Sequence, residues 1–131
     1  MRFLFVCVGN TCRSQLAEGI ARSMGHEAVS AGTHPGNAVA EHALTILEEM
    51  GIDASNMKPK SVNSIDTSGF DRIVSMGCGV SCPNLPIDED WGLDDPVGHP
   101  LDVYRDVAKT IISNLDRISQ ASSDGGNPPE P

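Results

Sequence analysis

The sequence predicts an α/β fold: a three-layer sandwich in which a four-stranded parallel sheet of strand order 2-1-3-4 carries helices on both faces. The main observation is that segments with strand character alternate with segments of helical spacing along the chain. The first strand, residues 3–6, is a continuous apolar run, which is typical of a strand buried on both faces. For a parallel sheet of four strands we expect the flavodoxin-like strand order. This order places a binding crevice at the carboxyl ends of strands 1 and 3.

The N-terminal half alternates strand, helix, strand and helix. After residues 3–6, apolar side chains recur at helical spacing as far as Gly25, where a glycine favours the end of a helix. Residues 28–31 predict a second strand, and a second helix follows that ends at Gly51. The apolar faces of these helices contain Leu16, Ala17, Ile20, Ala21 and Met24, and Val39, Ala43, Ile46, Leu47 and Met50.

The next part of the chain is less regular. The polar stretch 53–67, which Pro59 interrupts, predicts a loop with at most one turn of helix. Residues 70–76 predict the third strand. Residues 84–87, or those just after them, predict a short fourth strand, and Pro86 places it near an edge or a strand end.

A last helix is predicted from near Pro100 to residue 118 by apolar side chains at helical spacing. Residues 121–131 are mainly Ser, Asp, Gly and Pro with nothing to bury, so a disordered tail is expected there. We therefore expect a single domain over residues 1–120.

Composition and charge argue against some classes of partner and location for this chain. A net charge of −9 argues against nucleic acid and against an anionic membrane surface as partners. The apolar run at the N-terminus ends at Gly9, too short for a signal peptide or a membrane span, so a cytoplasmic location is expected. Thiols stay reduced in that compartment, so the cysteines indicate chemistry or metal ligation rather than structural disulfides. They are Cys7, Cys12, Cys78 and Cys82.

The pattern Cys-x5-Arg-Ser, from Cys7 to Ser14, lies between the first predicted strand and the first predicted helix. Backbone N–H groups of such a loop and the helix N-terminus can bind an anion and favour the thiolate of Cys7 as nucleophile. Arg13 can hold two oxygens of a tetrahedral oxyanion, and Ser14 can donate a hydrogen bond to the thiolate. Gly9 and Asn10 tolerate the positive φ that a tight loop needs. The predicted oxyanion loop consists of Val8, Gly9, Asn10, Thr11, Cys12 and Arg13.

Within this loop the sequence assigns no reaction step to Cys12. A bystander thiol is the favoured interpretation, because a buried cysteine often behaves as a small apolar side chain.

A carboxylic acid lies in the loop before the last helix, where Asp94 and Asp95 precede Pro96. Attack by a thiolate on an oxyanion requires a proton for the departing oxygen, and such an acid can supply it. Asp-Pro is also an ordinary turn pair, so the residues alone leave both interpretations open.

Cys78 and Cys82 follow the third predicted strand, which places them beside the Cys7 loop in the predicted topology. A second thiol can attack Cys7 to form a disulfide, and a third can take that disulfide over. The alternatives are half of a metal site, which no His or Cys cluster completes, or two inert buried cysteines. We expect no metal here.

These segments resemble the low-molecular-weight protein tyrosine phosphatase family, and its arsenate reductase branch in particular. The residues that carry the resemblance are the loop 7–14, the following Gln-Leu-Ala-Glu-Gly at 15–19, and Ser-Ala-Gly at 30–32. In the reductase branch a Gln follows Arg-Ser, whereas the phosphatases more often have Pro there. The resemblance extends from residue 1 to about residue 118.

The resemblance implies roles for the other candidate residues. It makes Asp95 the general acid, and the Asp-Pro-x-Gly form is similar to that of the reductases. It implies a redox disulfide between Cys78 and Cys82, reduced by thioredoxin, glutaredoxin or mycothiol, with no cofactor. The short spacing of these two cysteines, followed by Pro83, also resembles relatives that use mycothiol.

The resemblance also points to a cation position. Asn10, Glu18 and Ser30 correspond to positions that hold potassium in some similar reductases. The remaining ligands, expected within residues 58–61, do not match, so no ion is expected.

The expected function is reduction of arsenate to arsenite. In this interpretation Cys7 attacks arsenate, Asp95 protonates the leaving oxygen, and Cys78 and Cys82 complete a thiol-disulfide relay. The first alternative is a phosphotyrosine phosphatase that uses Cys7, Arg13 and Asp95 alone. The second is a non-catalytic sensor that holds arsenite or a soft metal through three cysteines.

Overall fold

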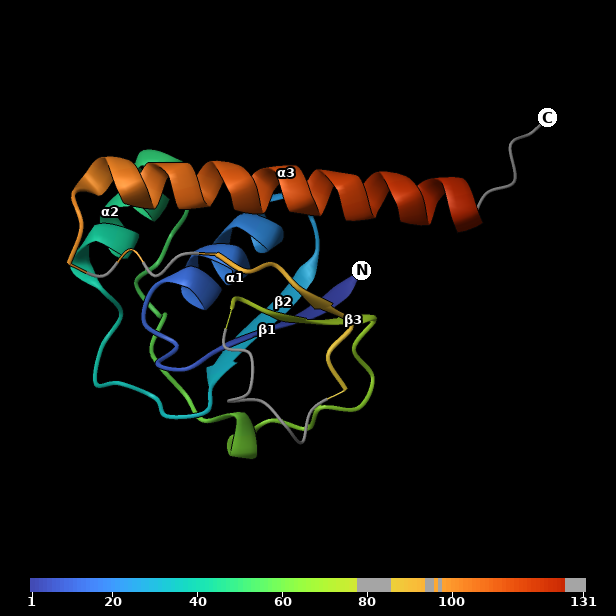
Figure 1. The fold of residues 1–131 in the computed structure, drawn as a ribbon, viewed down its shortest axis with the longest axis horizontal. Coiled ribbons are helices and arrows are strands. Elements are labelled where there is room, and N and C mark those ends of the chain that lie inside the picture. Colours follow the sequence, from blue (N-terminus) through green and yellow to red (C-terminus); the bar gives the residue numbers. More distant parts are fainter. Residues whose placement is uncertain (78–85, 94–95, 97, 127–131) are drawn as a thin grey trace.

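The computed structural model describes residues 1–77, 86–93, 96 and 98–126. In this part of the chain the strands form one parallel sheet in the order β2-β1-β3-β4 (Figure 1). They are β1 (Arg2–Cys7), β2 (Glu27–Gly32), β3 (Arg72–Ser75) and β4 (Glu89–Asp90). The predicted order 2-1-3-4 is therefore confirmed, and β4 lies just after the predicted residues 84–87.

Strand β1 is central because its side chains are apolar on both faces. Phe3, Leu4, Phe5 and Val6 are fully buried. Side chains alternate along a strand, so Phe3 and Phe5 join one hydrophobic cluster while Leu4 and Val6 join another.

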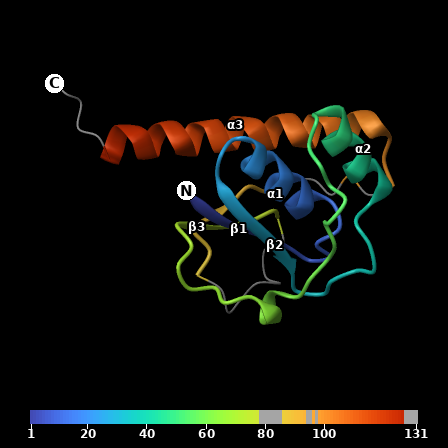
Figure 2. The ribbon, with the colours of Figure 1, turned by 180° about the vertical axis from the view of Figure 1, so that it is seen from behind.

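The helices are divided unequally between the two faces of the sheet. Helices α1 (Arg13–Ser23), α2 (Glu41–Glu49) and α3 (Leu101–Gly126) pack in the cluster that contains Phe3 and Phe5. Figures 1 and 2 show all three on one side of the sheet. The 3-10 helix η1 (Val62–Ser64) lies on the other side, where Val62 packs against Leu4 and Val6. The connection from α2 to β3 forms only this short helix because it is polar and contains Pro59.

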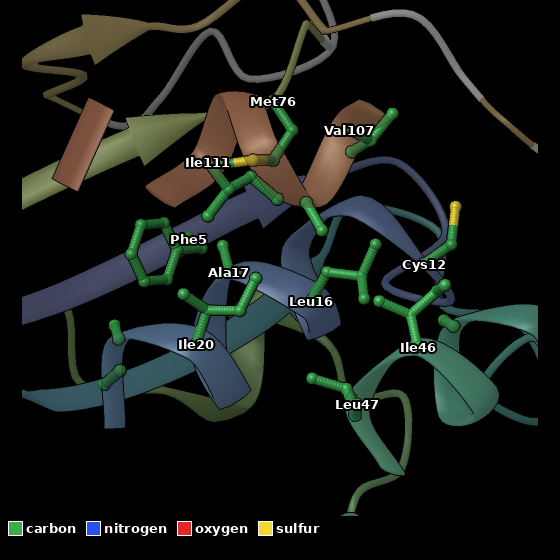
Figure 3. Packing of buried hydrophobic residues seen from close by; sticks show 14 of the residues in the cluster. Phe5, Cys12, Leu16, Ala17, Ile20, Ile46, Leu47, Met76, Val107 and Ile111 are labelled. Carbon is green, nitrogen blue, oxygen red and sulfur yellow. The ribbon is translucent and has the colours of Figure 1, made fainter. Parts of the chain in front are cut away.

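Both the sheet and the helices contribute side chains to the core between them. Figure 3 shows Phe5 of β1, Leu16 and Ile20 of α1, Met76 after β3, and Ile111 of α3 converging. Such interdigitation holds α1, and therefore the loop before it, against the end of β1.

Ile111 offers a test of this packing because it is fully buried, whereas the adjacent Ile112 is only partly buried. Ile111→Ala is expected to lower the free energy of unfolding by about 3 kcal/mol, from lost apolar burial and the cavity that remains. Ile112→Ala makes the same chemical change and should cost about 1 kcal/mol. Urea denaturation followed by circular dichroism measures both values. Equal losses at the two positions would contradict this account of the core.

Helix α3 begins one residue after Pro100 but continues to Gly126, so residues 121–126 are helical rather than a disordered tail. No helix breaker occurs after Leu101 until the Gly125-Gly126 pair, and extending a formed helix is much easier than starting one. The tail prediction for 127–131 lies outside the described residues, and the single domain over 1–120 stays a prediction. Neither α3 nor any other helix among the described residues is long and apolar enough to cross a membrane.

Candidate active site

The loop between β1 and α1 surrounds the sulfur of Cys7. The thiol is almost completely buried, and its Sγ lies 2.9 Å from Ser14 Oγ. The backbone N–H of Asn10 donates to the same sulfur at 3.1 Å. Cys7 ends the central strand and Arg13 begins α1. The sulfur therefore lies near the helix N-terminus, whose partial positive charge stabilises a negative charge.

The carbonyl groups of this loop are bonded away from the sulfur. Carbonyl and N–H groups of a trans peptide point in opposite directions, so bonding the carbonyls outward leaves the following N–H groups on the inner side of the loop. This geometry suits an anion, and anion binding by the loop stays a prediction. The outward bonds, of 2.7 to 3.1 Å, run from the N–H groups of Thr33, His34, Gly36 and Ala40 to the carbonyls of Cys7, Val8, Gly9 and Thr11.

Asn10 provides the left-handed backbone conformation in the loop. Its φ is +53°, whereas Gly9 does not have a positive φ. The side chain of Asn10 is fully buried and its Nδ2 donates to Ser14 Oγ at 2.8 Å. Asn10 therefore bonds to Cys7 through its backbone N–H and, through its side chain, to Ser14, the other group that bonds to Cys7.

Two backbone carbonyls hold the side chain of Arg13. Its Nη1 donates to Met76 O at 2.8 Å and to Leu93 O at 2.7 Å. Its Nε is buried and has no acceptor within the described part of the chain, so a donor remains for an oxyanion. Gly77 makes this close approach possible: its φ is +106°, and a Cβ there would lie 3.2 Å from Arg13 Nη1.

The geometry agrees with comparisons to known proteins. The family model for low molecular weight phosphotyrosine protein phosphatase matches residues 2–122. The chain belongs to this family. The glutaredoxin arsenate reductase of Synechocystis sp. is 34% identical over 124 residues, which cover 89% of this chain and 95% of that protein.

Two solved structures of the same family are similar to this chain. An arsenate reductase in the phosphate binding state has a TM-score of 0.81 at 34% identity, over 89% of this chain and 95% of that one. The low molecular weight protein tyrosine phosphatase from T. tengcongensis has a TM-score of 0.77 at 32% identity, over 92% and 99% of the two chains. The fold is therefore shared by reductases and phosphatases.

The remaining predicted residues of this phosphatase-family site lie outside the described residues: Asp94, Asp95, Cys78 and Cys82. Their described neighbours, Gly77 and Leu93, both lie at Arg13. The roles of the four residues stay predictions.

Trp91 organises the segment that leads to residues 94 and 95. Its ring packs against Phe5 with centroids 5.6 Å apart, and its Nε1 donates to Glu89 Oε1 at 3.0 Å. Glu89 also pairs with Arg117 of α3 at 2.7 Å. The hydrogen bond from Arg117 lowers the pKa of Glu89, partial burial opposes this, and the Trp91 bond adds to the lowering. Trp91 thus packs against the central strand at the start of this segment.

Glu18 is buried with its charge balanced by protein groups. Its carboxylate accepts from Ser30 Oγ at 2.7 Å and pairs with Arg22 at 3.1 Å and Lys60 at 3.5 Å. The Lys60 ammonium already faces this carboxylate, so these residues do not fit a bound potassium ion. Among the described residues there is also no cluster of three or more His, Cys, Asp or Glu that could hold a metal.

Cys12 lies in the hydrophobic cluster near Leu16 and Ile46, on the helical side of the loop (Figure 3). The role of a bystander thiol for Cys12 stays a prediction.

Two residues that contact the site were not predicted as part of it. Gln15 bonds to Asn10, and the backbone N–H of Lys60 donates to Asn10 Oδ1 at 2.9 Å. The only sequence signal for Gln15 was its place after Arg-Ser, where many phosphatases have Pro. For Lys60 the resemblance indicates only that residues 58–61 lie near Asn10 and Glu18, and residues 53–67 have no periodicity that would predict the backbone bond to Asn10.

Proposed function

We propose that this chain reduces arsenate to arsenite. The observation that carries the proposal is the pairing of a buried, hydrogen-bonded Cys7 thiol with an Arg13 whose Nε faces no protein acceptor among the described residues. A tetrahedral oxyanion can occupy such a loop, with Arg13 and the inward N–H groups as its donors. The names of the similar arsenate reductases support arsenate as that oxyanion.

The first step is nucleophilic substitution at arsenic. The Cys7 thiolate forms a sulfur–arsenic bond as one arsenic–oxygen bond breaks, and Asp95 gives its proton to the departing oxygen. Arsenic remains in the +5 state in this step.

The second step transfers two electrons. The Cys78 thiolate attacks Cys7 Sγ, a disulfide forms, and the electron pair of the sulfur–arsenic bond passes to arsenic, which leaves as arsenite. Cys82 then attacks Cys78, which frees the Cys7 thiolate and leaves a Cys78–Cys82 disulfide. An external dithiol, or two molecules of a monothiol, supplies the two electrons that reduce that disulfide.

The reductant is a thiol carrier: thioredoxin, glutaredoxin or mycothiol. The Synechocystis relative is named a glutaredoxin arsenate reductase, which supports a thiol donor of this class. A reducing compartment such as the cytosol keeps all three cysteines ready for the next cycle.

A hydrolase is the second candidate, because a tyrosine phosphatase shares the fold at 32% identity. A phosphatase needs Cys7, Arg13 and Asp95, and water completes its cycle without Cys78 or Cys82. A sensor that holds arsenite through thiols would bind arsenite stoichiometrically and would not respond to Asp95→Asn.

Arsenite release by the Cys78→Ser and Cys82→Ser variants tests the proposal, with each of the three thiol donors supplied in turn. Cys78→Ser is expected to release no arsenite, because nothing can take the sulfur from arsenic. Cys82→Ser should release one arsenite per chain and then stop at a Cys7–Cys78 disulfide. This holds for a thiol donor that reduces only the Cys78–Cys82 disulfide. Phosphate binding by calorimetry should be unchanged in both variants.

Two results would contradict this scheme. One is turnover of Cys78→Ser at the wild-type rate with thioredoxin. The other is a Cys7–Cys12 disulfide in peptide maps after a single turnover. A mixed disulfide with mycothiol on the intact protein would instead identify the reductant.

A further inference from the structure

The hydrogen bond between Cys7 Sγ and Ser14 Oγ can run in either direction, because a thiol and a hydroxyl both donate and accept. The direction matters for the reaction. A thiolate has no proton to donate, so Ser14 stabilises it only when the hydroxyl hydrogen points at the sulfur.

The orientation of the Asn10 carboxamide determines that direction. The backbone N–H of Lys60 can only donate, and it lies 2.9 Å from Asn10 Oδ1. That atom is therefore the acceptor end of the amide. Nδ2 then points at Ser14 Oγ, 2.8 Å away, and donates to it. In the described part of the chain Ser14 Oγ has two partners, Asn10 Nδ2 and Cys7 Sγ. Nδ2 can only donate, so the hydroxyl hydrogen is left to point at Cys7.

Gln15 supports this arrangement from a position that does not touch the sulfur. Its Nε2 donates to Asn10 O at 3.0 Å, to Asn10 Oδ1 at 3.1 Å and to Lys58 O at 3.0 Å. Two of these oxygens are backbone carbonyls, which only accept, so the NH2 end of Gln15 must face them. Gln15 is fully buried, which strengthens these bonds and excludes competing water.

The same NH2 group joins two segments that are distant in sequence. By bonding Lys58 O and both oxygens of Asn10, it holds residues 58–60 against the oxyanion loop, so that the Lys60 N–H reaches Asn10 Oδ1.

We infer that Gln15 is a positioning residue that fixes the donor direction of the chain Asn10–Ser14–Cys7 and thereby favours the Cys7 thiolate. The inference deepens the proposed function in that it takes Cys7 as the reacting thiol. It concerns the readiness of that thiol to react and does not require that the oxyanion be arsenate.

The pH dependence of Cys7 alkylation by iodoacetamide tests this inference without arsenate. Tandem mass spectrometry of the peptide separates alkylation at Cys7 from alkylation at Cys12. Gln15→Met keeps the length of the side chain and removes its polar end. The midpoint of the alkylation profile is expected to rise by about one pH unit, which lowers the thiolate fraction about tenfold at a pH well below the midpoint.

A double-mutant cycle with Ser14→Ala separates positioning from a general structural role. Ser14→Ala should raise the midpoint by itself. Adding Gln15→Met to it should then change the midpoint by less than about 0.3 units, since the group through which Gln15 acts is gone. Gln120→Met is the matched control, because the chain's other glutamine is exposed on α3, and its midpoint should equal that of the wild type.

Two outcomes overturn the inference. One is a Gln15→Met protein with lower stability in urea but an unchanged alkylation midpoint. The other is additive midpoint shifts in the double variant. If Gln15→Met does not fold, Gln15→Asn takes its place in the same cycle, with a smaller rise expected because its NH2 group reaches less far. Failure of arsenate turnover would count against the proposed function alone, because alkylation needs no arsenate.

Discussion

Replacing Cys7 with serine is expected to lower arsenate reduction by a factor of about 10⁴ or more, as for other enzymes that lose their nucleophile. A serine hydroxyl in this loop is a far weaker nucleophile than a thiolate, and it cannot form the disulfide that delivers electrons to arsenic. Both steps that form a bond at Cys7 are lost together. Steady-state arsenite release, with enough enzyme to detect very slow turnover, measures the loss.

The Cys7→Ser variant should still bind phosphate, and this separates the chemical step from binding. The serine oxygen can take the place of Sγ between the Asn10 N–H and Ser14, and the outward carbonyl bonds of the loop are untouched. Calorimetry with phosphate should therefore give a dissociation constant within a few-fold of the wild type. Turnover within tenfold of the wild type would exclude Cys7 as the nucleophile.

Arg13→Lys is expected to lower kcat/KM for arsenate about 10³-fold, at the upper end of what loss of an oxyanion donor costs. A lysine keeps the positive charge but has no planar fork, so it cannot bond Met76 O and Leu93 O while it also offers Nε to the oxyanion. The effect should appear in KM as well as in kcat, because ground-state binding uses the same donors. Steady-state kinetics and phosphate calorimetry measure the two contributions.

Arg22→Lys provides the control for Arg13→Lys, because both residues lie on α1. Arg22 pairs with Glu18 and donates to Ala28 O, and it contacts no residue of the oxyanion loop in these interactions. Its kcat/KM should stay within about threefold of the wild type, because Arg22 is half-exposed and a lysine keeps the positive charge beside Glu18. Similar losses for Arg13→Lys and Arg22→Lys would mean that general charge, rather than the Arg13 geometry, determines activity.

The parts of the site that could be predicted from the sequence are those determined by local chain chemistry. A buried strand ending in Cys7, a loop containing Gly and Asn, and a helix starting near Arg13 follow one another directly, so the pattern identifies their arrangement. Asn10 does adopt the left-handed conformation that its residue type allows. Sheet order could also be predicted, because β1 is apolar on both faces and must lie centrally.

The parts that could not be predicted depend on contacts between distant segments. Lys60 reaches Asn10 from a stretch with no periodicity, and its backbone N–H makes the bond, so the identity of its side chain gives no signal. Gly77 makes room for Arg13 beside Leu93, a contact between distant segments that no local pattern predicts. No pattern in the sequence indicates that the Arg13 guanidinium bonds two carbonyls from different segments, those of Met76 and Leu93.

The position of Trp91 gives the protein an optical probe of its own. It is the single tryptophan of the chain, so intrinsic fluorescence excited at the red edge of protein absorption comes from one indole ring. That ring packs on Phe5 and lies two residues before Leu93, whose carbonyl bonds Arg13. Emission intensity and wavelength therefore report on the surroundings of Arg13 in the unlabelled protein, on the timescale of a stopped-flow experiment.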